Sequence, residues 1–108
     1  MERVLFKTDN SKHWTDGRFY EEFIYLEAEA AEILVELRVK LVGIDYLSID
    51  KFHSEKHPSH FVLLGRNVVI VEGLNLLNVP PGKYHMTALP LNLQDVDGAP
   101  TRIILRAG

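Results

Sequence analysis

The chain has 108 residues, which allows one domain and leaves little room for a second. Apolar residues make up 46% of it and charged residues 25%, the ordinary balance of a globular domain. Its net charge of −3 and its scattered lysines and arginines argue against a nucleic-acid partner, and the lack of cysteine excludes disulfides, zinc–thiolate sites and a cysteine nucleophile.

The beginning of the chain carries no apolar run of the length that a signal peptide needs. No stretch approaches the ~20 apolar residues of a membrane-spanning helix. We therefore expect a cytoplasmic protein without a membrane partner.

The first half of the chain has the element order of a β-α-β unit. Residues 4–6 predict a short strand, and the polar composition of residues 9–18 predicts a loop. Residues 39–45 predict a strand that ends at an acidic residue. Between them, residues 27–37 predict a helix whose apolar face repeats at spacings of three and four: Ala30, Ile33, Leu34 and Leu37.

The second half predicts a short helix, a buried strand and a hairpin. Residues 50–59 are polar, and Pro58 is expected to interrupt any helix there; a short helix over residues 61–64 then ends at Gly65. Residues 68–71 are four consecutive β-branched residues, which favours a strand covered on both faces. The hairpin is predicted from residues 84–93 and 101–105, and Pro90 confines its strand to an edge or a bulge.

These elements predict a single α/β domain over residues 1–108, with a mixed sheet and flanking helices. No internal repeat, low-complexity tract or linker divides the chain. The fold class is therefore predicted from the alternation of strand and helix patterns.

Glu72 comes directly after the β-branched run. In open α/β sheets ligands bind outside the carboxyl ends of the strands, so a carboxylate at this position lies beside the expected crevice. A partly buried carboxylate needs a cation, a metal or a hydrogen-bond partner to stay charged. Taken alone, a solvated glutamate at a strand end is the more ordinary interpretation, because most glutamates are exposed.

His60 precedes the apolar residues of the short helix and lies 12 residues before Glu72. A histidine from a helix and a glutamate from the next strand can converge at one rim of a crevice. A neutral imidazole and a carboxylate are workable ligands for zinc or manganese. Two ligands are too few for a catalytic zinc, and a surface histidine at a helix start is the ordinary alternative.

His53, His57 and His60 are spaced four and three apart, which would align them on one face of a continuous helix. Pro58 argues against such a helix, so a self-contained three-histidine metal site is disfavoured. No partner is evident for the two remaining histidines, His13 and His85.

Asp45, Ser48 and Asp50 cluster just after a predicted strand. A serine between two aspartates suggests a nucleophile, but no positioned base is visible and the glycines of a nucleophile elbow are missing. We favour a structural role, in which short polar side chains close the strand end and shape the crevice wall without taking part in chemistry.

Several ordered segments of this chain together resemble one family, the metal-dependent cyclase or kynurenine formamidase (arylformamidase) hydrolases. The most specific blocks are Gly43-Ile44-Asp45 and Glu72-Gly73-Leu74. They are supported by residues 30–34, 40–50, 60–64, 69–74, 88–93 and 97–102, in the family's order and over nearly the whole chain.

The resemblance implies the C-terminal half of the family's swivelling β/β/α fold. It implies that His60 and Glu72 match the family's two C-terminal metal ligands. It also implies hydrolysis of an amide or a cyclic amide, with a divalent metal, zinc or manganese, as the cofactor.

The sequence departs from the family at the other metal ligands. Those come from a His-x-Gly-Thr-His-x-Asp motif in the family's N-terminal half, and this chain contains no such motif. The segment after His13 does not replace it. The resemblance therefore implies that this chain holds only part of the family's set of metal ligands.

Three hypotheses follow. In the first, this chain joins a separately supplied N-terminal half, and the two together form an arylformamidase-like hydrolase of a small-molecule substrate. In the second, it is a non-catalytic remnant or a binding module that covers its open strand edges and apolar faces by forming a homo-oligomer. In the third, the sequence is part of a longer gene product.

Overall fold

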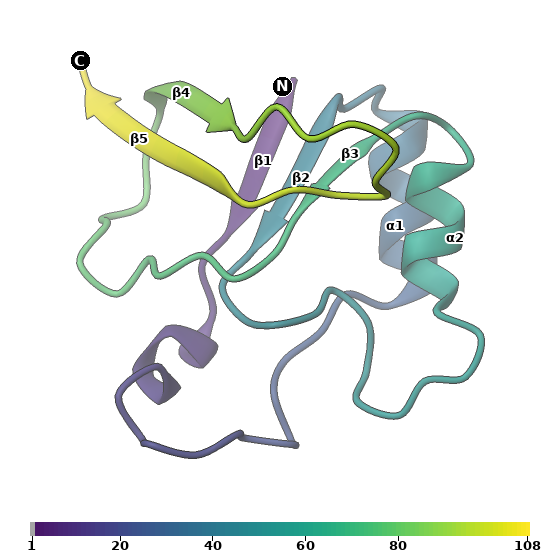
Figure 1. The fold of residues 1–108 in the computed structure, drawn as a ribbon, viewed down its shortest axis with the longest axis horizontal. Coiled ribbons are helices and arrows are strands. Elements are labelled where there is room, and N and C mark those ends of the chain that lie inside the picture. Colours follow the sequence, from purple (N-terminus) through teal and green to yellow (C-terminus); the bar gives the residue numbers. More distant parts are fainter. Residues whose placement is uncertain (1) are drawn as a thin grey trace.

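Three parallel strands form the central sheet. The computed structural model describes residues 2–108, and in it β1 (Arg3–Phe6) pairs with β2 (Leu41–Ile44), which pairs with β3 (Val69–Val71). The spatial order β1-β2-β3 follows the chain, as Figure 1 shows. Every residue of the central β2 is buried. The prediction that residues 68–71 are covered on both faces is wrong for Val69, which is 55% exposed because β3 is an edge strand.

Two helices connect the strands and lie side by side on one side of the sheet (Figure 1). Helix α1 (Ala28–Glu36) connects β1 to β2, and helix α2 (Pro58–Leu64) connects β2 to β3. The two β-α-β connections have the same handedness and move across the sheet in the same direction. Both helices therefore lie on the same face of the sheet. The hydrophobic core lies between this helix pair and the sheet: Leu26, Ala31, Leu34, Val39, Val42, Ile44, Ile49, Leu63 and Val68.

Helix α1 is where the sequence predicted it, but its buried face is turned from the predicted one. Ala31 and Leu34 are buried, whereas Ile33 and Leu37 are 57% and 59% exposed. The prediction gave weight to the larger apolar side chains. The structure instead turns the small Ala31 inward, where its short side chain lets the helix backbone come close to its neighbours.

Helix α2 begins three residues earlier than predicted, because Pro58 starts the helix rather than interrupting it. Proline is tolerated at the first helical position, where its missing N–H would have no partner within the helix. The preceding His57 has a left-handed backbone with φ of 44°, so no continuous helix runs through the three histidines. Gly65 ends the helix as predicted.

The segment predicted as a loop after β1 contains a 3-10 helix, η1 (Asp9–His13), so that prediction is wrong there. The Oγ1 atom of Thr8 accepts a hydrogen bond from the N–H of Asn10 at 2.9 Å and starts the helix. The sequence prediction relied on polar composition. It did not include the buried carboxylate of Asp45, which binds this segment to the end of β2.

The predicted C-terminal hairpin is confirmed. Strand β4 (Tyr84–Pro90) pairs antiparallel with β5 (Thr101–Ala107) as a separate two-stranded sheet, so Pro90 lies on an edge strand as expected. Among residues 2–108 no other helix or strand packs against the hairpin. The predicted α/β class is confirmed, with parallel and antiparallel strands in two sheets rather than in one.

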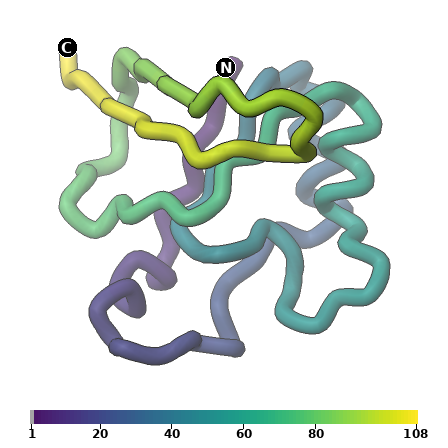
Figure 2. The backbone as a smooth tube through the Cα atoms, in the orientation of Figure 1, coloured from purple at the N-terminus to yellow at the C-terminus, as the bar shows by residue number. Residues whose placement is uncertain are grey.

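The long connections after β1 and β2 run along the carboxyl ends of the parallel strands (Figure 2). The N–H of Leu26 in the first connection donates to the carbonyl of Ile49 in the second, at 2.9 Å. In the part of the chain that the structure describes, no helix combines the length and the apolar character needed to cross a membrane.

Asp45 is the polar link between the sheet and η1, and its removal should be costly. Its fully buried carboxylate accepts hydrogen bonds from the N–H and hydroxyl groups of both Thr8 and Ser11, at 2.7–3.2 Å. We expect Asp45→Ala to lower the free energy of unfolding by about 3 kcal/mol, because it leaves these donors without a partner.

Urea denaturation measures this loss. The matched control is Asp9→Ala, which removes an exposed carboxylate that pairs with Lys12 and should change stability by less than about 0.5 kcal/mol. Equal small losses in both variants would contradict the structural role of Asp45.

Candidate metal centre

His60 lies on the first turn of α2, between two carboxylates from different segments. Its Nδ1 atom is 2.6 Å from Oδ2 of Asp50, and its Nε2 atom is 2.9 Å from Oε2 of Glu72. The His60 side chain is 26% exposed and that of Glu72 is 31% exposed, so the pair borders solvent. The structure thus brings together His60 and Glu72, as the sequence predicted.

Glu72 directly follows β3 and lies at the carboxyl edge of the parallel sheet. Its Oε2 atom accepts a hydrogen bond of 2.8 Å from the N–H of Ile49, in the connection after β2. The next residue, Gly73, has a φ of 79° and donates its N–H to the carbonyl of Tyr46 at 2.6 Å. The position of Glu72 is therefore fixed twice, by the N–H that its carboxylate accepts and by the backbone hydrogen bond of the residue that follows it.

Asp50 is 1% exposed, and its carboxylate faces N–H groups at the start of α2. It accepts from the backbone N–H of Ser59 and from the backbone N–H and ring of His60, at 2.6–2.9 Å. Burial raises the pKa of Asp50, but these N–H groups lower it more, so the pKa lies below its ordinary value. Asp50 is therefore an ionised, buried acceptor.

The sequence assigned Asp50 to the crevice wall and missed its contact with His60. The signal that could have revealed it is at the start of α2, where the capping residue His57 makes no side-chain cap bond. The first N–H groups of a helix need acceptors, and a buried aspartate from a neighbouring loop can supply one.

Asp45 and Ser48 have structural contacts, in keeping with their predicted role. Asp45 binds η1, and the Oγ atom of Ser48 accepts the N–H of Asp50 at 3.1 Å in a serine turn.

The other histidines are arranged differently. His57 is exposed, but a ligand atom of it lies within 4.8 Å of ligand atoms of Asp50 and His60, so these three form a second possible metal group. His13, for which the sequence gave no partner, has its Nδ1 atom 2.6 Å from Oδ2 of Asp16. Neither His13 nor His53 belongs to a metal-ligating group among residues 2–108.

The donor atoms of His60 and Glu72 fit a divalent cation. An imidazole that donates Nδ1–H to Asp50 presents a lone pair at Nε2. Two electron-pair donors that lie 2.9 Å apart attract a proton or a cation between them. Ligands at about 2.0–2.2 Å from zinc are ~2.8–3.4 Å from one another, so this separation suits one coordination sphere.

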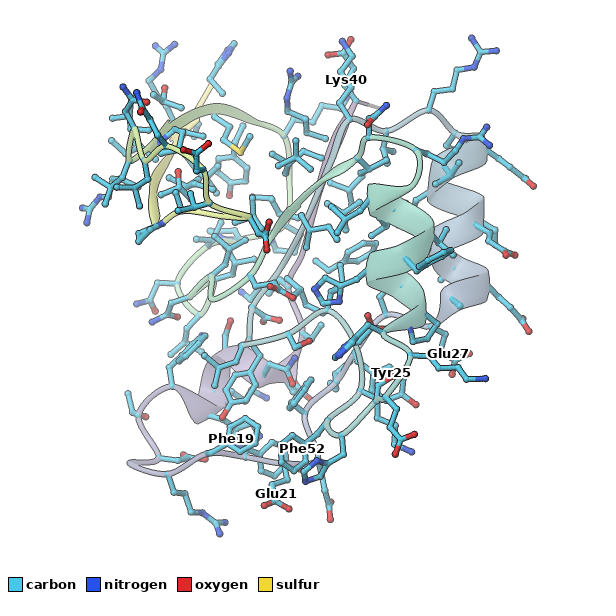
Figure 3. All side chains as sticks on the ribbon, turned by 45° about the vertical axis from the view of Figure 1, so that its right-hand side comes forward. Phe19, Glu21, Tyr25, Glu27, Lys40 and Phe52 are labelled. Carbon is cyan, nitrogen blue, oxygen red and sulfur yellow. The ribbon has the colours of Figure 1, made fainter. Side chains whose placement is uncertain are left out.

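An aromatic cluster lies beside this edge of the sheet and was not predicted. Its centre is Tyr46, which is 2% exposed and contacts three rings of the connection after β1, those of Trp14, Phe19 and Phe23. Phe19 and Phe52 meet edge to face with centroids 4.8 Å apart and are labelled together in Figure 3. A surface hollow of about 360 Å³ borders the cluster at Phe23 and Phe52, and neither His60 nor Glu72 lines it.

The comparisons with known proteins agree with this arrangement. The Cyclase family model matches residues 1–51. The kynurenine formamidase of Salinibacter ruber is 40% identical to this chain over 97% of it, and cyclase-like protein 3 of Oryza sativa subsp. japonica is 42% identical over the same share. A solved structure, described as a potential metal-dependent hydrolase with cyclase activity, superposes over 97% of the chain with a TM-score of 0.87 and 42% identity.

The chain belongs to the cyclase family. It spans 49% of the length of the Salinibacter ruber protein, 40% of the rice protein and 52% of the solved structure. The family predicted from ordered sequence blocks is thus confirmed, and so is the fold. About half of each relative has no counterpart in this chain.

Tyr46 offers a test of how the aromatic cluster is held. Its hydroxyl accepts the backbone N–H of Tyr20 at 2.9 Å, and the residue is almost fully buried. We expect Tyr46→Phe to lower the free energy of unfolding by about 1 kcal/mol, because the N–H of Tyr20 then loses its acceptor.

Thermal and urea unfolding measure the loss. Tyr25→Phe is the control, since Tyr25 is 37% exposed and its hydroxyl has no such contact with Tyr20; it should be neutral. A Tyr46→Phe variant as stable as the wild type would contradict the assigned hydrogen bond.

Proposed function

We propose that this chain contributes His60 and Glu72 to the divalent-metal centre of a hydrolase that cleaves amide or cyclic amide bonds. The observation that carries the proposal is the 2.9 Å approach of His60 Nε2 to Glu72 Oε2 at the carboxyl edge of a parallel sheet. The relatives named kynurenine formamidase and the solved metal-dependent hydrolase support the reaction class. An arylformamidase-like activity on a small molecule is the form we infer.

His60 and Glu72 would hold the metal, and their nitrogen and oxygen donors suit zinc or manganese. When bound, the metal supplies Lewis-acid activation of water and of the scissile carbonyl. Asp50 accepts the Nδ1 proton of His60 and leaves Nε2 free as a donor atom. The N–H of Ile49 holds the Glu72 carboxylate beside it.

Two ligands do not complete a catalytic centre, since catalytic zinc has three protein ligands in most enzymes. The missing ligands would come from the other half of the family fold. The family resemblance assigns them to a His-x-Gly-Thr-His-x-Asp motif in that half. This chain spans about half the length of its relatives, which is in keeping with a site assembled from two halves. We propose that the second half is supplied by a separate polypeptide.

The β4–β5 hairpin is the surface that we propose for this second half. An isolated two-stranded hairpin is only marginally stable in water, so such an element needs a partner surface. No helix or strand among residues 2–108 packs on it. Leu89 and Ile104 of its open face are 57% and 50% exposed. Exposed apolar side chains of this kind mark interaction sites.

The metal ligands can be tested by removing one charge. In the protein assembled with its second half, we expect Glu72→Gln to abolish stoichiometric zinc or manganese binding while leaving the fold intact. The amide keeps the shape of the side chain but loses the charged donor oxygen. Metal content after dialysis and the circular dichroism spectrum are the two measurements.

Two control variants define the site. Glu32→Gln makes the same change on the exposed face of α1 and should keep the metal. His57→Ala should also keep it, because the Asp50 oxygens near His57 already accept three N–H groups. If His57→Ala lost the metal and Glu72→Gln retained it, the ion would belong to the group of Asp50, His57 and His60 instead.

Assembly can be tested with a defined partner. The probe is the part of the Salinibacter ruber kynurenine formamidase that lies outside its match to this chain. We expect the two polypeptides, when co-expressed, to purify as a complex that hydrolyses formylated aromatic amines. Ile104→Lys should weaken the complex, because it places a charge on the open face of the hairpin. Ile33→Lys, on the exposed side of α1, should not.

The alternative functions are outcomes of this experiment. A complex without metal or hydrolysis would point to a non-catalytic remnant. Self-association of the chain, abolished by Ile104→Lys, would point to an oligomeric binding module. Metal-dependent hydrolysis by the purified chain alone would show that no second half is needed.

A further inference from the structure

The loop that follows β2 contacts both side chains of the candidate pair through consecutive residues. The N–H of Ile49 donates to Oε2 of Glu72 at 2.8 Å. The Oδ2 atom of Asp50 lies within hydrogen-bond distance of Nδ1 of His60, at 2.6 Å. Ile49 is fully buried and Asp50 is 1% exposed, so this part of the loop is held within the protein.

Asp50 determines which nitrogen of His60 is free. Both oxygens of the Asp50 carboxylate already accept backbone N–H groups, Oδ1 from Ser59 and Oδ2 from His60, so the 2.6 Å contact suits a ring that donates Nδ1–H to Oδ2. Nε2 is then the nitrogen left to face Glu72, 2.9 Å from its Oε2 atom, and to give its lone pair to a metal. Histidines that ligate metals are commonly held by such a carboxylate, and its loss typically weakens metal affinity by about 10–100-fold.

The backbone contacts of the same carboxylate make the ring position rigid. Asp50 also accepts the N–H groups of Ser59 and His60, which have no acceptor within the first turn of α2. The helix start and the ring are therefore held by one side chain. A movement of the helix start relative to the loop would break the ring contact and the cap together.

We propose that Asp50 is a positioning residue that fixes the tautomer and the direction of the His60 ring, so that the two donor atoms are prearranged within this chain before any second half joins. The inference deepens the proposed function and rests on it for the role of the metal. The state of the ring itself can be measured without metal. Asp50 contacts no reacting atom and acts through His60.

A purely structural role for Asp50 is the rival explanation, because it also caps α2. The two roles differ in what they do to the ring. A cap alone has no effect on which ring nitrogen carries the proton. Asp45 is the matched comparison: it is equally buried, it precedes Asp50 by five residues in the same connection, and its hydrogen bonds go to η1 instead of to His60.

The experiment is a long-range ¹H–¹⁵N spectrum of the histidine rings in the metal-free chain, recorded above the ordinary histidine pKa of about 6.5. We expect His60 in the wild type to carry its proton on Nδ1. In Asp50→Asn we expect the proton to shift toward Nε2, whereas Asp45→Asn should leave it on Nδ1. A wild-type ring without a proton on Nδ1 overturns the proposal without any variant being needed.

Zinc affinity in the assembled protein is the second measurement, by competition with a chelator. We expect Asp50→Asn to weaken binding by about 10–100-fold and Asp45→Asn to leave it unchanged at temperatures where both variants are folded. Equal losses in both variants, or none in Asp50→Asn, would reduce Asp50 to a structural residue. If Glu72→Gln kept full affinity, the proposed metal pair would fail, and the ring spectrum would still decide the role of Asp50.

Discussion

The hydrogen bond between Asp50 and His60 is the contact on which the geometry of the candidate site depends. It joins the loop after β2 to the start of α2, two segments that converge because the parallel sheet brings its carboxyl ends to one edge. A buried carboxylate is stable as an anion only with donors around it, and α2 supplies three. The same contacts turn Nε2 of His60 toward Glu72.

The sheet and the hairpin have different relations to this site. The three parallel strands and the two helices form a packed unit in which both donor side chains already lie together. The hairpin stands apart from that unit, since no other helix or strand among residues 2–108 packs closely against it. The chain spans about half the length of its relatives, and this division is in keeping with our proposal that one part is a preformed half of a metal site and the other a surface for the second half.

The sequence predicted the features that depend on local pattern or on strand order. The convergence of His60 and Glu72 followed from a helix start and a strand end at one edge of a parallel sheet. The role of Asp50 could not be predicted in this way. Its contact with His60, ten residues later, is made by a loop that turns back on itself, and such a loop leaves no periodic pattern in the sequence. The buried face of α1 was missed for another reason: the small Ala31 is fully buried, whereas the larger Ile33 and Leu37 are exposed.

Anomalous diffraction from crystals of the assembled protein soaked in Mn²⁺ would show directly whether His60 and Glu72 bind one metal ion. We expect one strong peak in contact with both Nε2 of His60 and the Glu72 carboxylate, with Nδ1 of His60 still hydrogen-bonded to Asp50. A peak bound by Asp50 and His57, or a fully occupied metal that does not touch His60, would contradict it.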